Sequence, residues 1–553
     1  MIKSTLKLLK PTLFSFLKSH RYTQKELLKD MLSGLSVAIV ALPLAMAIAI
    51  ASNLPPERGL FTAIVAGFLI SALGGSRYQI GGPTAAFIVT VAMVAMKHGY
   101  EGLVLATMIA GILLIIASLL RAGELIKFIP YPVIVGFTSG IAILILFSQL
   151  RDFFGLQIEF MPPDFIDKLF VYFEHLHETN PFSVLIALFS IGIILYMKQK
   201  FQKIPAPIVV VAATSLLVWL FGIPVETIES RFGAIPAMLP SPTLPELSFE
   251  KFRLVFADAI TIALLAGIES LLSAVVADGM SGDKHKPNTE LFAQGVANIG
   301  SSIFGGLPAT GAIARTATNI KAGAISPISG IMHALWLLLF MMILAPLIVK
   351  VPLAALSAIL IVVAYNMAEI KHIRSILKAP RNDQAVLFTT LLLTVLVDLN
   401  FAIQAGISLA AILFINSMMQ STRIHSIHEE DETDDPDSIT KKIVPQGVEV
   451  YEIKGPLFFG VAEKLVDTLL IFESTPKVFI LRLRHVPMID AAGLHALESL
   501  YEQLAHEGST LILSGVNKNL ATYIKNSHLD AKIGDENILG HIDKALSRAK
   551  SLL

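Results

Sequence analysis

The stretch GLPATGAIARTATNI, residues 306–320, determines how the rest of this chain is interpreted. Arg315 is its only charged residue before the following Lys321, and its neighbours are small or apolar. In a bilayer, a guanidinium in such surroundings costs about 3 kcal/mol or more unless a partner or a ligand offsets the charge. We therefore ask whether this stretch lies in a membrane, and what Arg315 binds there.

The composition places most of the chain in a bilayer. Of 553 residues, 54% are hydrophobic and 16% are charged, whereas soluble domains carry about 25% charged residues. Apolar stretches of about 17–25 residues, the length that spans a bilayer, recur from Met31 to Met419, and we expect about fourteen of them. The sequence thus predicts an α-helical polytopic membrane protein. Residues 1–30 are Lys-rich and amphipathic, without the apolar core of a signal peptide, and are expected to form a cytosolic segment or a helix on the membrane surface.

The basic residues predict the orientation of the chain. They gather in alternate short connections, at Arg77, Arg121, Lys198, Lys284 and Lys371 among others. The long connections between these are more acidic. Cytoplasmic loops carry the excess of Lys and Arg, so both termini are expected in the cytoplasm. The chain has a net charge of zero and no cysteine, which leaves no disulfide and no thiolate metal site.

The C-terminal part has a different pattern. After the acidic segment HEEDETDDPDS, residues 428–438, short strands alternate with helices, as in a small α/β domain with one core. The expected domains are a cytosolic N-terminal amphipathic segment, a transmembrane transport domain, an acidic linker and the α/β domain, at residues 1–30, 31–421, 422–446 and 447–553.

An internal repeat relates the Arg315 stretch to an earlier one. GGPTAAFIVTVAM begins at Gly81 and GGLPATGAIARTA begins at Gly305. Both start with Gly-Gly, continue with Pro, Thr and small residues, and lead into a short apolar segment. They are the third and tenth expected crossings, and two halves of seven crossings are inverted relative to each other. The two segments are therefore expected to enter from opposite sides and point at each other.

Two facing helix N-termini form a site for an anion, because their N–H groups and dipoles are positive. Arg315, expected about one and a half turns inside the second segment, adds a full charge and can donate two parallel hydrogen bonds to an oxyanion. The alternative is a structural ion pair with Glu269, the nearest intramembrane carboxylate in the pattern. Glu269 shares a Ser-rich face with Ser270 and Ser273. Because burial favours the protonated form of a carboxylate, Glu269 can carry a proton, or it can hold sodium together with hydroxyl and carbonyl oxygens.

Several dispersed motifs, in the same order, resemble the sulfate permease (SulP) family of anion transporters. The first is PLAMAIAIASNLPPERGLFTAIVAGFLISALGGSRYQIGGPTAA, residues 43–86, and the second is NTELFAQGVANIGSSIFGGLPATGAIART, residues 288–316. The C-terminal segment resembles the cytosolic STAS domain of that family. The resemblance covers nearly the whole chain.

The resemblance implies a seven-plus-seven inverted repeat, divided into a mobile core domain and a gate domain that makes little contact with substrate. It also implies elevator-like transport, a homodimer, and a multi-pass location in the inner (cytoplasmic) membrane. Carried over by position, substrate binding would fall to Leu44, Ile48, Thr84, Ala85, Ala312, Ala314 and Arg315. Coupling to a proton or to sodium would fall to Glu269 and Ser273.

Departures from the family pattern bear on the substrate. Many members have Gln and an aromatic residue at the positions of Leu44 and Ile48, and Ser at the position of Ala314, so this pocket offers sulfate fewer hydrogen bonds. Sodium-coupled members tend to have Asp at the position of Glu269, which favours proton coupling here. The motifs are most similar to the bacterial branch associated with four-carbon dicarboxylates. The expected function is proton-coupled uptake of such dicarboxylates. The alternatives are a sodium- or proton-coupled bicarbonate or sulfate transporter, and an anion channel.

Two other functional classes, a membrane-bound enzyme and a sensor that signals through its C-terminal domain, find little support in the sequence. A nucleotide-binding Gly loop, a metal-spaced His cluster and a nucleophile triad are all missing from it, so we expect neither an enzyme nor a cofactor, a metal site or a nucleic-acid partner. In MIDAAGL, Ala491 follows Asp490 where regulatory relatives of the STAS domain place a phosphorylatable Ser. We expect Asp490 to be a helix N-cap, and the domain to be a module for packing or for binding a soluble partner.

Overall fold

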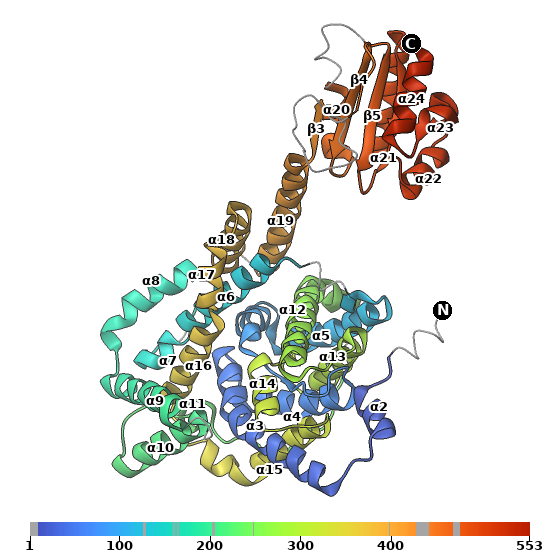
Figure 1. Ribbon diagram of the computed structural model, residues 1–553. Helices are drawn as coiled ribbons and strands as arrows, with labels where there is room; N and C mark the ends of the chain where they lie inside the picture. The colour runs from blue at the N-terminus through green and yellow to red at the C-terminus, as the bar shows by residue number, and fades with distance from the viewer. Residues whose placement is uncertain are drawn as a thin grey trace. The chain divides into compact units, whose positions relative to one another are not determined.

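The structure is a computed structural model. It describes residues 9–124, 129–158, 161–162, 165–201, 205–246, 248–397, 399–426, 442–467 and 476–553. The chain forms two compact units, Met1–Ile407 and Ser408–Leu553. The first, here called the membrane unit, is built of helices and one short strand pair, and the second, the C-terminal unit, contains a five-stranded β-sheet (Figure 1).

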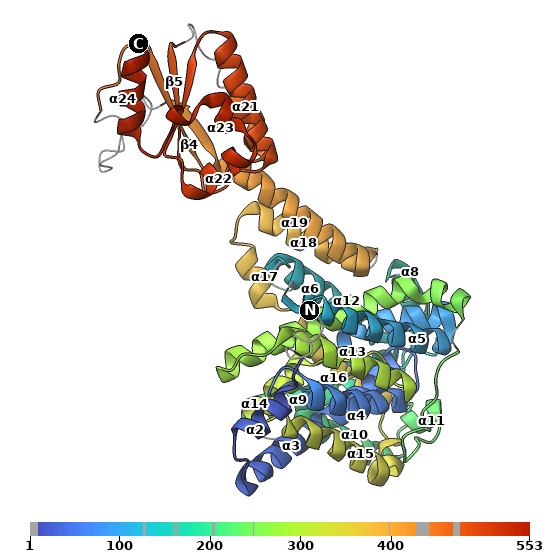
Figure 2. The same cartoon turned by 90° about the vertical axis from the view of Figure 1, so that its right-hand side faces the viewer.

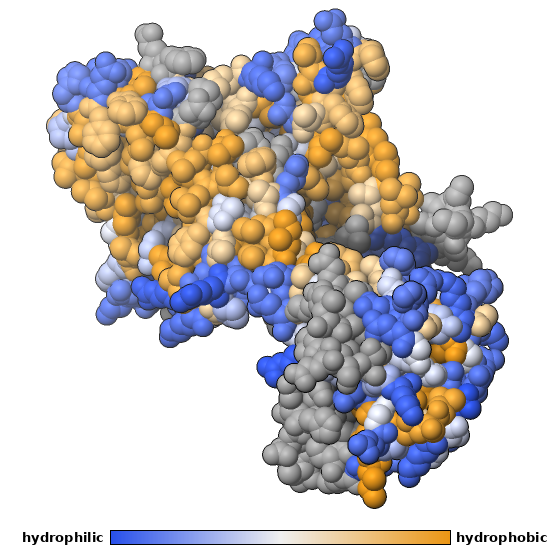
Figure 3. All heavy atoms as spheres, turned by 90° about the horizontal axis from the view of Figure 1, so that it is seen from above, coloured by the Kyte–Doolittle hydropathy of each residue, from blue (hydrophilic) through white to orange (hydrophobic). Residues whose placement is uncertain are grey.

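The membrane unit has the surface of a protein that lies in a bilayer. Within the described residues, nine helices are long and apolar enough to cross a membrane. In Figure 3 a broad hydrophobic surface on this unit is bordered by hydrophilic atoms on both sides. These observations confirm a helical polytopic membrane domain. The number fourteen stays a prediction, because several helices are short and α5 joins two segments through Gly99, whose φ of 71° interrupts the helix.

One group of helices, here called the core helices, packs together around the middle of the unit (Figures 1 and 2). It comprises α3 (Gln24–Ala51), α4 (Pro56–Leu73), α5 (Ile88–Leu119), α12 (Phe249–Ser281), α13 (Pro287–Ile303), α14 (Ile313–Lys321) and α15 (Ile328–Ile348). Their contact faces carry many small residues. A Cβ added at Gly59 would lie 1.9 Å from the Ala45 carbonyl oxygen, so α3 and α4 approach as closely as backbones allow.

A second group, here called the gate helices, packs together beside the core helices. It comprises α6 (Tyr131–Ser148), α7 (Leu150–Phe154), α9 (Pro181–Lys200), α10 (Ala206–Phe221), α16 (Leu353–Met367) and α18 (Arg381–Leu396). The remaining helices of this unit are α2 (Thr12–Ser19), α8 (Phe165–His175), α11 (Ile228–Phe232) and α17 (Ile370–Ile376), and α19 runs from Leu399 to Ser421. Along the chain, core helices precede gate helices twice, which is the order that two repeats produce.

The boundary at residue 31 between the cytosolic segment and the membrane domain stays a prediction, because a helix can extend beyond the membrane. Helix α3 begins at Gln24, within the segment that we expected to be cytosolic. The reason is a capping box, in which the Thr23 hydroxyl accepts from the Glu26 N–H and the Glu26 side chain accepts from the Thr23 N–H. Asp30 is buried and accepts hydrogen bonds from the Ile325 N–H at 2.7 Å and the Ser326 hydroxyl at 2.6 Å. The expected cytosolic segment therefore contributes its last residues to a core helix.

The C-terminal unit is an α/β domain. Its sheet has the order β3-β4-β5-β6-β7, with β4 to β7 parallel and β3 antiparallel to β4. The strands are β3 (Arg423–Ser426), β4 (Val448–Lys454), β5 (Val478–His485), β6 (Thr510–Ser514) and β7 (Ile538–Leu539). The helices are α20 (Phe459–Asp467), α21 (Ala491–His506), α22 (Lys518–Asn526), α23 (Leu529–Ile533) and α24 (Ile542–Leu552). Alternating residues of the strands bury one apolar face under α21 and the other under α24 (Figure 2).

Two expectations about this part of the chain have clear outcomes. Asp490 is the N-cap of α21, and its side chain accepts the Gly493 N–H at 2.8 Å, as predicted. Arg423–Ser426, expected in the linker, instead forms strand β3, because partly buried Ile424 packs on the domain core. The acidic segment at residues 428–438 lies outside the described residues.

Candidate functional site

The two repeated segments meet at a short strand pair. Strand β1 (Gly81–Gly82) runs antiparallel to β2 (Thr310–Gly311), with Gly81 opposite Gly311. After β1 the chain enters the 3-10 turn η1 (Ala85–Phe87) and then α5, and after β2 it enters α14. A Cβ at Gly311 would lie 1.7 Å from Nε2 of Gln79, so a larger residue there would displace this side chain, which donates to the Ser270 carbonyl. The structure thus brings the starts of the two segments together.

Gly305, which the sequence repeat aligns with Gly81, is not part of the strand pair. Gly305 lies before β2 in a separate turn, with φ of 62°. Its carbonyl accepts hydrogen bonds from Tyr100 Oη at 2.6 Å and from Arg58 Nη1 at 3.1 Å. The second segment therefore needs more residues than the first to reach the crossing point.

Helix α12 holds the strand pair in place through hydroxyl groups. The Ser270 hydroxyl lies 2.6 Å from Oγ1 of Thr310 and accepts the Gly311 N–H at 3.0 Å. Gln79 Nε2 donates to the Ser270 carbonyl at 3.1 Å. Because these groups form hydrogen bonds with each other and with the backbone, a buried polar network fixes the β1–β2 strand pair.

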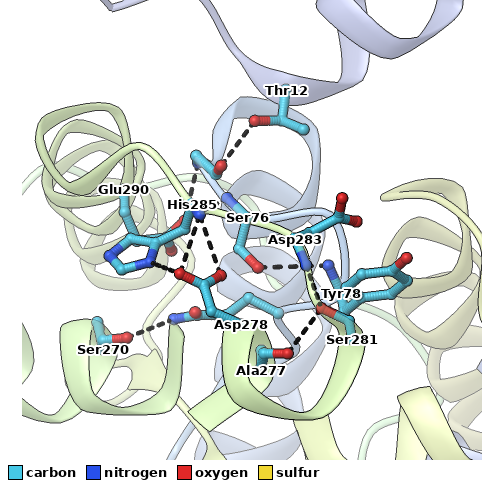
Figure 4. A network of polar contacts seen from close by, with 12 residues as sticks. Thr12, Ser76, Tyr78, Ser270, Ala277, Asp278, Ser281, Asp283, His285 and Glu290 are labelled. Atoms are coloured by element: carbon cyan, nitrogen blue, oxygen red, sulfur yellow. Dashed lines mark hydrogen bonds and ion pairs between the residues drawn. The ribbon is translucent and has the colours of Figure 1, made fainter. Parts of the chain in front are cut away.

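A second network fixes the connection that precedes β1 (Figure 4). The buried Glu290 carboxylate accepts the N–H groups of Gly75 and Ser76 at 2.8 and 3.1 Å. Asp278, at the end of α12, accepts the His285 backbone N–H at 3.0 Å and lies 2.7 Å from Nδ1 of the same residue. These contacts tie the ends of α4, α12 and α13 together, so we assign them to the support of the site.

Arg315 is the third residue of α14 and is only 3% exposed. Its Nη2 donates to the Pro83 carbonyl, across the crossing point from the other repeat. Its Nη1 has no hydrogen-bond partner among the described residues. Arg315 lies in the first turn of the helix, not one and a half turns inside it, because Thr310 and Gly311 form a strand and the helix begins at Ile313. The guanidinium is therefore anchored on one side and retains a donor on the other.

Glu269 lies on α12, facing the same space. Its Oε2 accepts a hydrogen bond from the Thr84 hydroxyl at 2.8 Å. Within the described part of the chain, Glu269 and Arg315 form no direct ion pair, although both line the same cavity. The direct ion pair that we considered as the alternative role of Arg315 is thus not formed here.

A cavity of about 320 Å³ lies between core and gate helices. Eight of the nine residues expected from the sequence line it, namely Leu44, Ile48, Thr84, Ala85, Glu269, Ala312, Ala314 and Arg315. The gate side adds apolar residues and three polar ones, Thr138, Asn366 and Glu369. We did not expect these three, because in the sequence they resemble ordinary residues of a helix and of the connection that follows it.

Ser273 is the exception among the expected residues. It is fully buried and does not belong to the lining of the cavity. Its hydroxyl donates to Oγ1 of Thr316 at 3.3 Å, and Thr316 Oγ1 accepts the Ile80 N–H at 3.1 Å. Ser273 therefore supports α14 and β1 from behind. Among the described residues, no group of three or more His, Asp or Glu is arranged to hold a metal ion.

The chain has clear similarities to known proteins. The sulfate permease family matches residues 27–390, and the STAS domain matches residues 440–548. A Bacillus subtilis protein named putative sulfate transporter YvdB is 39% identical over 95% of this chain and 98% of its own length. The bicarbonate transporter BicA of a Picosynechococcus strain is 29% identical over 94% of each chain. The structure of a murine anion transporter of the solute carrier 26 family has a TM-score of 0.88 over 99% of this chain and 95% of that one, at 18% identity.

These similarities agree with the architecture of the chain. The family match includes the strand pair, Arg315 and Glu269, and the match to the murine structure shows the fold of the chain. The similar proteins are transporters rather than enzymes. This chain therefore belongs to the sulfate permease family of anion transporters and ends in a STAS domain.

Proposed function

We propose that this protein is a proton-coupled secondary active transporter of small carboxylate-bearing anions. The observation that carries the proposal is the cavity between core and gate helices, where Arg315 Nη1 has no partner among the described residues and Glu269 lines the same space. A carboxylate can accept a hydrogen bond from the unpaired Nη1 of this guanidinium. It is also attracted by the positive end of the α14 helix dipole.

Coupling follows from the charges that share the cavity. Arg315 offsets one negative charge, and an anion that binds beside it also faces the Glu269 carboxylate. Two negative groups in a site of low dielectric repel each other, and a proton on Glu269 removes that repulsion. The anion and the proton therefore favour each other's binding. Movement of the core helices past the gate helices, in the manner of an elevator, would carry both across the membrane.

The substrate proposal rests on the lining of the cavity. Leu44, Ile48 and Ala314 offer carbon surface rather than hydrogen bonds, which suits the methylene chain of a four-carbon dicarboxylate better than a compact inorganic anion. Bicarbonate is the second candidate, because BicA is similar over nearly the full length of both chains. Sulfate is the third, since the similar Bacillus subtilis protein is named for it.

We further propose that the protein works as a homodimer in the inner membrane with both termini in the cytoplasm, and that its STAS domain packs within the assembly or binds a soluble partner. Light scattering of the purified protein measures whether it is a dimer. Labelling of single cysteines introduced near each terminus, from either side of the membrane, measures on which side the termini lie. A monomer, or labelling of either terminus from outside, would contradict this arrangement.

Uptake by the purified full chain in liposomes tests the function. Labelled succinate, bicarbonate and sulfate are offered separately, with inward proton or sodium gradients imposed one at a time. We expect saturable uptake that a proton gradient drives and a sodium gradient does not. Uptake driven by sodium alone would replace the coupling ion. Unsaturable flux with a large current would identify a channel, and liposomes carrying Arg315→Ala provide the control for leakage.

A further inference from the structure

The gate side of the cavity contains a carboxylate that the proposed mechanism does not use. Glu369 follows α16 and precedes α17, and it lines the cavity together with Asn366 and Thr138. Its backbone has φ of 46° and ψ of 40°, the left-handed conformation that residues with a Cβ rarely adopt. Such an outlier at a ligand cavity is a reason to ask what the side chain does there.

The surroundings of Glu369 leave its charge only partly balanced. Nδ1 of His372 lies 3.2 Å from Oε2 of Glu369, and the His372 ring packs edge-on against Tyr131, at 5.9 Å between ring centroids. Among the described residues, no Lys or Arg forms an ion pair with Glu369. The Glu369 side chain is 33% exposed, so its charge acts on the cavity but is weakened by water.

The cavity thus has two carboxylates and a single guanidinium among its described lining residues, Glu269, Glu369 and Arg315. Arg315 offsets one negative charge of a bound anion. A proton on Glu269 removes one source of repulsion, but Glu369 on the opposite group of helices remains. The second charge of a dianion must then share a cavity of about 320 Å³ with a carboxylate that nothing in the proposed cycle neutralises.

From this arrangement we propose that Glu369 is a specificity-determining residue that makes the cavity select singly charged anions over dianions. The preferred substrate is a monoanion that carries its own O–H group, such as bicarbonate or a singly protonated dicarboxylate, because that group can donate a hydrogen bond to Glu369 or Asn366. Sulfate, which lacks a donor and has two charges, is disfavoured. This inference rests on the proposed anion site at Arg315, but it does not require proton coupling.

Binding to the purified full chain tests the inference, with ligand pairs that differ by one charge. The pairs are succinate with its monomethyl ester, and sulfate with methyl sulfate, at neutral pH. Apparent dissociation constants come from stabilisation of the protein against heat by each ligand. We expect each monoanion to bind more tightly than its dianion. In Glu369→Gln, the dianion should gain about tenfold in affinity and the monoanion much less.

Three variants separate charge from shape. Glu369→Asp keeps the charge and should keep the preference for monoanions. Glu369→Gly removes the charge and also relieves the left-handed backbone, and it should behave like Glu369→Gln if charge alone matters. Asn366→Asp adds a negative charge to the same side of the cavity and should weaken binding of the dianion further.

An unchanged ratio of dianion to monoanion affinity in Glu369→Gln would overturn the inference, even if uptake is proton-driven. Tighter binding of the dianions to the unaltered protein would also overturn it. A ratio that changes as expected, in a protein without proton-driven uptake, would keep the role of Glu369 and reject the proposed coupling.

Discussion

The two segments that meet at the cavity both begin with a short strand, but they differ in chemistry. The first contributes neutral groups, the Pro83 carbonyl and the Thr84 hydroxyl, whereas the second half of the chain contributes the charges, Arg315 and Glu269. Each charge is bonded to a neutral group of the other half. The charged groups of the proposed site therefore come from the second half of the chain, and their neutral partners come from the first.

Removing the cation should have the largest effect. We expect Arg315→Ala to lower the rate of saturable uptake at least about 100-fold, because a buried charge-assisted contact to the anion contributes about 3 kcal/mol. Arg315→Lys should fail nearly as badly, since an ammonium cannot bond Pro83 and an anion with one planar fork. Uptake into liposomes and the melting temperature are measured together. Loss of folded protein would assign Arg315 a structural role instead.

Removing the carboxyl charge should break the coupling while leaving the path for the anion. Glu269→Gln keeps a group that can bond Thr84, but it cannot bind or release a proton. We expect accumulation driven by a pH gradient to disappear, whereas exchange of labelled for unlabelled substrate at equal pH continues. Both assays use the same liposomes. Continued accumulation that follows the pH gradient would rule Glu269 out as the coupling group.

Adding a methyl group at Gly82, beside Arg315, should have a smaller effect. In Gly82→Ala, the new Cβ would lie 2.6 Å from Nη1 of Arg315, so the guanidinium must shift away from its place. We expect affinity for the anion to fall about tenfold, as displacing a binding group by a fraction of an ångström does. Gly233→Ala is the matched control, because Gly233 also has a positive φ but has nothing within 4 Å of its added Cβ. Equal losses in both variants would point to backbone strain alone.

The sequence was sufficient to predict that Arg315 and Glu269 lie at one cavity, and their roles there stay a proposal. Arg315 and Glu269 are charges inside apolar stretches, and such charges indicate function wherever the fold brings them. The opposed segments were also predictable, because Gly and Pro at the start of a short apolar stretch indicate a broken helix. The division into a helical membrane domain and an α/β domain was also predictable, because long apolar stretches indicate membrane helices whereas short alternating stretches indicate strands.

Other features depended on distances that a sequence does not contain. Asn366 and Glu369 reach the cavity only through the packing of α16 against α3 and α6. Ser273 lies one helical turn after Glu269, yet this turn faces Thr316 instead of the cavity. The sequence also contains no signal for the pairing of Gly81 with Gly311, because a two-residue strand pair is set by the packing around it.

The neutral half of the crossing should yield the smallest effect, and Thr84→Val measures it. Valine keeps the shape of threonine but removes the hydroxyl that donates to Glu269 at 2.8 Å. Without this donor the charged carboxylate is less favoured, so half-maximal uptake should need a proton concentration about fivefold lower, a free-energy change of about 1 kcal/mol. Thr84→Ser should restore the original dependence, because it restores the donor. If Thr84→Val instead acts as strongly as Arg315→Ala, the first segment does more than position its partner, and the division of roles between the two halves is wrong.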